Sequence, residues 1–206
     1  MFQIDQINVG GFDSNFSYLV RNGNAAAVID PCGEIEKIRT AWEKEKRMTP
    51  SLSPVYILLT HSHRDHVSGV AEVRTFFDAP VCASLFTDYP CDRKLSDGEH
   101  LPFGNGFLEC IHTQGHTRDS VCYRFSDNSA LFTGDTLFIG CCGFCQAEPM
   151  FQSMTRLRAL PDSLIVYSGH NYGNVPSDSL GNQKKVNPYL SAGTFSLFRE
   201  RLRHLE

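Results

Sequence analysis

The sequence has no hydrophobic run long enough to cross a membrane. No uninterrupted stretch of aliphatic and aromatic residues exceeds five, as in segment 55–59, whereas a spanning helix needs about 20. Residues 1–10 also lack the basic and apolar regions of a signal peptide. We therefore expect no membrane partner and a cytoplasmic location.

The sequence also lacks an excess of positive charge. Its 19 Lys and Arg residues stand against 23 Asp and Glu, which gives a net charge of −4. A nucleic-acid-binding surface needs clustered cations, so we expect no nucleic-acid partner. No internal repeat or low-complexity linker divides the 206 residues, and the length suits one domain. We therefore expect residues 1–206 to form a single domain.

Eight cysteines without a secretory signal are typical of reduced thiols. Cys141, Cys142 and Cys145 form a cluster with three possible roles. A metal site is disfavoured because no second Cys-x-x-Cys pair accompanies them. A redox role stays open, and small packing residues beside a pocket are the favoured interpretation.

Strands in runs, interrupted by a few helices, dominate the hydrophobic pattern. This pattern indicates an α+β protein with a mixed sheet or two sheets and helices outside. Most of 89–106 and all of 172–187 are rich in polar and turn residues and are predicted as loop. The predicted strands are 2–9, 16–20, 25–29, 55–60, 80–83, 107–111, 121–125, 130–133 and 164–168, and the predicted helices are 34–46, 68–77, 150–160 and 194–205.

A histidine-rich segment directly follows the predicted strand 55–60. It places His61, His63, Asp65 and His66 within six residues. A short loop can direct His61 and His63 toward one point and the other two toward an adjacent one. Imidazole nitrogens and carboxylate oxygens are ligands for zinc and related transition metals, so this loop is a candidate metal site.

Three more candidate ligands, His116, Asp135 and His170, each lie just past a predicted strand and beside a glycine. Glycine allows close backbone approach, and loops at strand ends commonly carry functional sites. The other histidines lack this setting and are interpreted as structural or surface residues: His100, His112 and His204.

The ordered motifs H-x-H-x-D-H, G-H-T, T-G-D-T and G-H resemble the signature of the metallo-β-lactamase superfamily. Segments 131–138 and 166–173 are most similar to its glyoxalase II branch. The resemblance extends over residues 29–189 and implies an αββα four-layer sandwich with a binuclear metal site.

The same resemblance implies the ligand set. The first site would comprise His61, His63 and His116, and the second would comprise Asp65, His66 and His170, with Asp135 bridging the two ions. The cofactors would be two divalent metal ions, with Zn²⁺ expected and iron or manganese as alternatives. Candidates for orienting the imidazoles are Thr60, Thr117 and Ser168.

The implied reaction is hydrolysis of a thioester through a metal-bridging hydroxide. A thiolate suits this chemistry as a leaving group, because a free thiol has a pKa of about 8.5. His61, His63 and Asp65 are the expected catalytic residues, and Asp65 is a candidate for handling the proton. The expected partner is a small-molecule thioester, such as S-lactoylglutathione, or an acyl group on a carrier protein.

Two departures separate the sequence from glyoxalase II itself. Only about 35 residues follow His170, too few for the helical domain that helps to hold glutathione. Phe144 stands where that branch usually has a basic residue. The short single-domain members are therefore the better match, and we expect Phe144, Tyr172 and Cys142 to line the substrate pocket. The sequence leaves the thiol carrier and the oligomeric state open.

Two alternatives use the same fold. A mono-iron persulfide dioxygenase would use His61, His116 and Asp135, but its Arg-x-Asp-Phe-Gln-like segment is absent here. A non-catalytic binding module is disfavoured because all five histidines and both aspartates of the signature are present.

Overall fold

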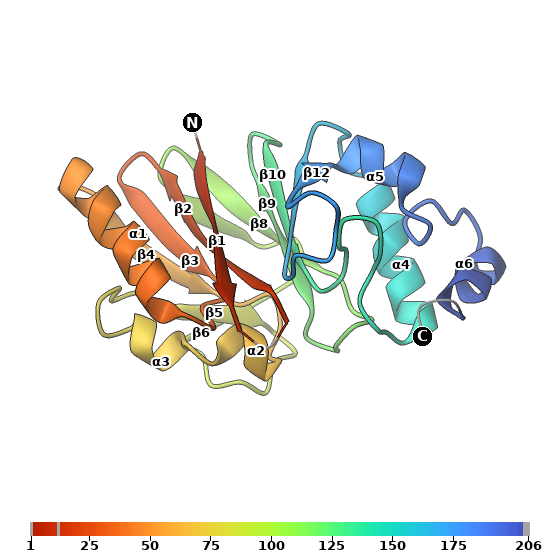
Figure 1. The fold of residues 1–206 in the computed structure, drawn as a ribbon, viewed down its shortest axis with the longest axis horizontal. Coiled ribbons are helices and arrows are strands. Elements are labelled where there is room, and N and C mark those ends of the chain that lie inside the picture. The colour runs from red at the N-terminus through yellow and green to blue at the C-terminus, as the bar shows by residue number, and fades with distance from the viewer. Residues whose placement is uncertain (1, 12, 204–206) are drawn as a thin grey trace.

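The computed structural model describes residues 2–11 and 13–203. Two six-stranded sheets pack face to face, and helices cover both outer faces (Figure 1). The structure therefore confirms the α+β class and the four-layer αββα sandwich.

The first sheet begins with antiparallel strands and continues with parallel ones. The turn between its second and third strands uses Gly23 at a φ of +58°, as expected for an Asn-Gly hairpin turn. The helices α1 (Ile35–Met48), α2 (Arg64–Val67) and α3 (Val70–Val73) cover its outer face. Its strands, in spatial order, are β1 (Gln3–Gly10), β2 (Asn15–Asn22), β3 (Ala25–Ile29), β4 (Ser53–Leu58), β5 (Val81–Ser84) and β6 (Arg93–Leu95).

The second sheet is antiparallel except for one parallel pair, β10 with β11. Its outer face is covered by α4 (Ala147–Arg158), α5 (Leu180–Val186) and α6 (Phe195–Leu202). Its strands, in spatial order, are β12 (Asp178–Ser179), β11 (Ile165–Ser168), β10 (Ala130–Gly134), β9 (Val121–Phe125), β8 (Gly106–His112) and β7 (His100–Phe103).

Buried aromatic side chains fill the space between the two sheets, among them Tyr18, Tyr123 and Phe132. Two of the tyrosines also tie the sheets together by hydrogen bonds. The Tyr123 hydroxyl donates to the Leu59 carbonyl at 2.8 Å, and the Tyr18 hydroxyl donates to the Ser168 carbonyl. Both acceptors lie at the strand ends from which candidate ligands project, so this core fixes the positions of those ends.

Two expectations about secondary structure were wrong, and a third missed two short strands. Segment 172–187, predicted as loop, contains β12 and α5, and segment 89–106, predicted as mostly loop, contains β6 and β7. Polar edge strands and a two-turn helix carry little hydrophobic periodicity, because few of their residues are buried. The predicted helix 68–77 is also shorter, because only Val70–Val73 form α3.

The predicted C-terminal helix is present as α6, which ends at Leu202. His204 and the last predicted helical residue lie outside the described residues. Within the described part of the chain, every helix is too short or too polar to span a bilayer.

The Tyr123 contact predicts a measurable loss of stability. The variant Tyr123→Phe leaves the Leu59 carbonyl without this donor in a buried setting, which costs about 1–3 kcal/mol of unfolding free energy. Urea denaturation measures the difference. Tyr89→Phe, at a partly buried tyrosine outside the core between the sheets, serves as the control. Equal midpoints for Tyr123→Phe and the wild type would contradict the assignment.

Candidate metal centre

Seven predicted ligands converge at one edge of the sandwich. The segment after β4 supplies four of them, two from its loop and two from the short helix α2, and the loops after β8, β10 and β11 supply one each. Within each of two groups the candidate ligand atoms lie within 4.8 Å of one another. The first group is His61, His63, His116 and Asp135, and the second is Asp65, His66 and His170.

Asp135 lies between the two groups. One of its oxygens, Oδ2, is 3.4 Å from His116 Nε2 and 3.3 Å from His170 Nε2. Its other oxygen, Oδ1, is 3.4 Å from His66 Nε2. This is the position that the sequence resemblance implied for a bridging carboxylate.

The residues present fit a pair of divalent cations. His61 Nε2 and Asp135 Oδ1 are buried and have no hydrogen-bond partner among the described residues. His63 Nδ1 faces His116 Nε2 at 2.9 Å, so these two nitrogens also point into the shared space. Buried polar atoms without partners are costly, and a cation would satisfy them. Five imidazoles and two carboxylates form a donor set suited to zinc and related metals.

The pKa shifts of two of these side chains favour the protonation states that can bind a cation. Burial and the nearby His66 hold the pKa of His61 well below its usual value, so its ring is neutral and keeps a free lone pair. Burial raises the pKa of Asp135, but the His66 charge and a hydrogen bond with His170 outweigh it and hold that pKa well below normal. Asp135 is therefore ionised.

His66 is the exception. Burial lowers its pKa, but Asp135 and Asp30 raise it to about 10. Without a cation, His66 is therefore protonated at neutral pH, and a cation must displace that proton to reach Nε2.

Contacts on the far side of three rings orient the ligands. His116 Nδ1 lies 2.8 Å from the Phe144 carbonyl, and His170 Nδ1 lies 2.8 Å from the Asp13 carbonyl, so each ring can donate there. His66 Nδ1 lies 3.1 Å from Asp30 Oδ2. Such partners fix the tautomer that leaves the other nitrogen free for a metal.

Asp30 was missed as a functional residue by the sequence analysis. It is buried, has a positive φ of +49°, and accepts hydrogen bonds from the Thr60 amide at 2.7 Å and the Thr60 hydroxyl at 2.5 Å. A strained backbone held by several contacts is a feature of functional sites. The available signal was an acidic residue directly after the predicted strand 25–29, the same placement that identified Asp135.

Only one of the three predicted orienting hydroxyls contacts a ligand ring. Thr60 Oγ1 lies 3.2 Å from His61 Nδ1. Thr117 instead pairs with the Ser120 hydroxyl at 2.7 Å, and the Ser168 hydroxyl donates to the backbone carbonyl of His170 at 2.9 Å. The hydroxyls of Thr117 and Ser168 neighbour ligand histidines in the sequence, but they point away from the imidazole rings.

Gly169 shows why a glycine accompanies a ligand. A Cβ at this position would lie 2.2 Å from Asp135 Oδ1 and 2.7 Å from His66 Cε1. Any other residue would therefore displace the candidate bridging carboxylate, as expected for a glycine that permits close approach.

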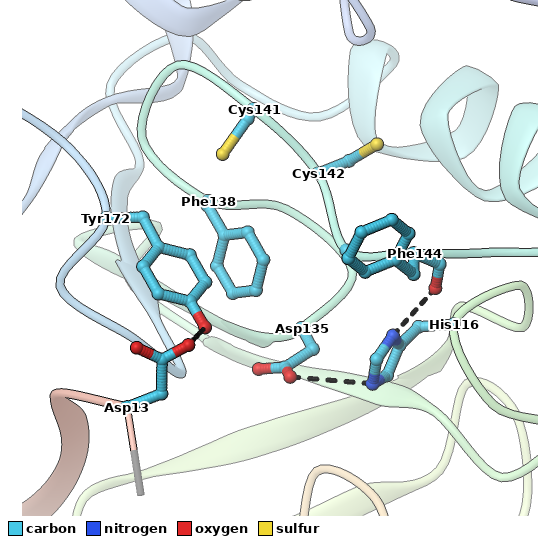
Figure 2. A pocket seen from close by; sticks show the side chains of 9 residues that line it. Asp13, His116, Asp135, Phe138, Cys141, Cys142, Phe144 and Tyr172 are labelled. Atoms are coloured by element: carbon cyan, nitrogen blue, oxygen red, sulfur yellow. Dashed lines mark hydrogen bonds and ion pairs between the residues drawn. The ribbon is translucent and has the colours of Figure 1, made fainter. Parts of the chain in front are cut away.

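A cavity of about 330 Å³ opens beside Asp135 and His116 (Figure 2). All three residues predicted to contact substrate line it: Cys142, Phe144 and Tyr172. The Tyr172 ring stacks on the His170 ring with 4.9 Å between centroids. Four further residues line the cavity but were not among the predicted substrate contacts: Asp13, Phe138, Cys141 and Gly143.

Among the described residues, the two remaining histidines and the cysteine cluster contribute no candidate ligand. His112 Nε2 contacts the Leu95 carbonyl at 3.1 Å, and His100 stacks on Phe107. Cys142 is buried in the core beneath α4, and Cys141 and Cys145 pack against that core. Neither candidate metal group in the described chain includes a cysteine, in line with the packing interpretation.

The Asp30 contact predicts weaker metal binding in Asp30→Asn. The substitution keeps the side-chain size but removes the charge that faces His66, and such changes typically cost about 10–100-fold in affinity. Competition with a chelator measures the dissociation constant. Asp78→Asn, at an exposed aspartate, is the matched control. An unchanged constant for Asp30→Asn would refute the orienting role.

The raised pKa of His66 predicts proton release on metal binding. Zinc added to the metal-free protein at neutral pH should displace at least one proton per chain, and the apparent affinity should rise with pH below about 10. Calorimetry in two buffers of different ionisation enthalpy counts the protons. Equal heats in both buffers would show that His66 is already neutral.

Comparison with known proteins agrees with this geometry. Residues 10–88 and 83–170 match the family model of the metallo-beta-lactamase superfamily. The chain is 35% identical over 190 residues to a Bacillus velezensis protein named "Probable polyketide biosynthesis zinc-dependent hydrolase BaeB", covering 85% of this chain and 81% of that protein.

Two further proteins are similar. The chain is 37% identical over 168 residues to the hydroxyacylglutathione hydrolase of Tolumonas auensis; the match covers 77% of this chain but only 62% of that protein. The crystal structure of ETHE1 from Myxococcus xanthus has a TM-score of 0.85 at 25% identity, covering 99% of this chain and 91% of that one. The family match, the relatives and the converging ligands agree, and the chain belongs to the metallo-β-lactamase superfamily.

Proposed function

We propose that residues 1–206 form one binuclear metal-dependent hydrolase domain that cleaves thioesters. The observation that carries this proposal is the position of Asp135, between two complete ligand groups and at the wall of a cavity. Zinc is the proposed ion because the Bacillus velezensis relative is named a zinc-dependent hydrolase. Iron and manganese accept the same ligands.

In this proposal each ligand group would hold one cation, with Asp135 between them. His61, His63 and His116 would hold the first, and Asp65, His66 and His170 would hold the second. When bound, two such cations supply Lewis acidity and lower the pKa of water toward neutrality.

Asp65 is proposed first to ligate a cation and also to help handle the proton, as a hydrogen-bond acceptor. Burial raises its pKa, but the His66 charge and a hydrogen bond donated by Asn15 at 3.1 Å lower it below the usual value. Asp65 is therefore an ionised acceptor near the reacting centre, 3.4 Å from His170. A thiolate leaving group needs little help from an acid, which favours a thioester over an amide or ester.

The cavity favours a small thioester or an acyl group on a carrier protein as the substrate. Its wall includes the aromatic side chains of Phe138, Phe144 and Tyr172, and among the described residues no lysine or arginine lines it. Phe144 is 70% exposed, so a long thiol arm can contact it from outside. The names of the two curated relatives, from polyketide biosynthesis and glutathione thioester hydrolysis, support these two classes.

The eight free cysteines support a reducing, cytoplasmic location.

The likeness to ETHE1 favours one alternative, a mono-iron persulfide dioxygenase that uses His61, His116 and Asp135. Two observations weigh toward the hydrolase. His63 Nδ1 faces the same space as His116 Nε2, and the second ligand group is complete. Metal content and substrate distinguish the two activities.

Elemental analysis combined with assays on S-lactoylglutathione and an acyl-coenzyme A tests the proposal. We expect about two divalent ions per chain and turnover of at least one thioester. One iron per chain with oxygen consumption on glutathione persulfide would establish the alternative and overturn the hydrolase.

His63→Ala tests the first site. Loss of one of its three imidazoles should reduce thioester turnover by about 100-fold or more and remove roughly one ion per chain. His100→Ala, at an exposed histidine on the β7 edge, controls for loss of an imidazole elsewhere. Full activity in His63→Ala would contradict the ligand assignment.

A further inference from the structure

The proposed function leaves the charge of one cavity residue unexplained. Asp13, in the segment between β1 and β2, lines the cavity together with Phe144 and Tyr172, and it belongs to neither candidate metal group. Among the described residues, no lysine or arginine lines the cavity. Asp13 therefore adds a negative charge that no basic side chain in the cavity wall compensates.

Contacts with two residues hold Asp13 in the cavity wall. The Tyr172 hydroxyl donates a hydrogen bond to the Asp13 carboxylate, which Figure 2 marks by a dashed line. The backbone carbonyl of Asp13 lies 2.8 Å from His170 Nδ1. The Tyr172 ring in turn stacks on the His170 ring, with an angle of 4° between the ring planes. The position of the carboxylate is therefore tied to the candidate metal centre.

The outer part of the cavity is open to solvent. Phe144 is 70% exposed, Tyr172 is 45% exposed, and Asp13 is also exposed. In the proposed function the reacting carbonyl lies at the inner end, beside Asp135, so the longer half of the substrate extends outward. That half is the thiol arm. A cavity of about 330 Å³ is at the small end of ligand pockets, so the arm must pass close to Asp13.

We propose that Asp13 is a specificity-determining residue that selects an uncharged, amide-bearing thiol arm, such as that of pantetheine, over an arm that carries carboxylates. This inference rests on the proposed function, because it concerns the thiol half of the same substrate. It goes further by naming the chemical class of the thiol carrier.

The carboxylate of Asp13 acts on the thiol arm in two ways. An ionised carboxylate only accepts hydrogen bonds, so it can pair with an amide N–H of the arm. It also repels a carboxylate on the arm, and two like charges 4 Å apart weaken binding about fivefold even in a water-like dielectric. Glutathione carries more carboxylates than ammonium groups, whereas pantetheine carries amides and no carboxylate. Both effects therefore favour the pantetheine arm.

The aromatic residues of the wall suit the same arm. Phe138 and Phe144 offer apolar surface, and the Phe138 ring packs edge-to-face on the Tyr172 ring with 4.9 Å between centroids. The Tyr172 hydroxyl already donates to Asp13, so its proton is engaged. These three side chains therefore provide contacts for methylene groups but no free donor for a carboxylate.

The test uses two probes that differ only in charge. They are the S-acetonyl thioethers of N-acetylcysteine and of N-acetylcysteine amide, in which a carboxylate and an uncharged amide of the same size occupy the same position. Both keep a carbonyl near the sulfur, but neither contains a thioester to be hydrolysed. Calorimetric titration of the metal-loaded protein should give at least about fivefold weaker binding of the carboxylate probe.

Three variants assign the selection to Asp13. Asp13→Asn keeps the backbone carbonyl that faces His170 and should make the two dissociation constants nearly equal. Asp13→Lys should reverse the preference. Asp78→Asn removes the same charge at an exposed aspartate outside the cavity wall and should keep the wild-type ratio of the two constants.

Two results would overturn the inference. An unchanged ratio in Asp13→Asn would show that Asp13 does not select by charge. Tighter binding of the carboxylate probe by the wild type would exclude the preference for an uncharged arm. Because these titrations require no turnover, they decide the role of Asp13 separately from the activity assays, in which the hydrolase proposal stands or fails on its own.

Discussion

The buried carboxylate of Asp135 is the constraint on which the rest of the site depends. It lies 3.3–3.4 Å from imidazole nitrogens of both ligand groups. A buried negative charge is stable only when it is compensated, and protonated histidines or bound cations are the two ways to compensate it here. The raised pKa of His66 is the first way, and a bound cation that displaces its proton is the second. A cation that binds at this site would therefore displace the proton of His66.

The sandwich serves this arrangement by holding strand ends together. Tyr123 connects β9 to the end of β4, and Tyr18 connects β2 to the end of β11. The ligands themselves lie on the loops that follow these strands, so the rigid layers set the spacing and the loops supply the chemistry. The cavity lies over the same edge, where the loop after β10 brings Phe138 and Phe144 beside Asp135 (Figure 2).

Much of the site was predictable because its signals are local. His61, His63 and His66 lie within six residues directly after a strand, and His116 and His170 each follow a strand and a glycine. The contacts that orient them were not predictable in the same way. The acceptors for His116 and His170 are backbone carbonyls of Phe144 and Asp13, and a carbonyl has no residue-type signature. The polar edge strand β6 was missed for a related reason, since only one of its three residues is buried and no alternation can show.

The most direct test of the account is anomalous diffraction from crystals of the protein grown with zinc and measured at the zinc edge. Two peaks roughly 3.5–4 Å apart should appear, with Asp135 in contact with both. A single peak held by His61, His116 and Asp135, with the second ligand group hydrogen-bonded within the protein, would contradict the binuclear centre.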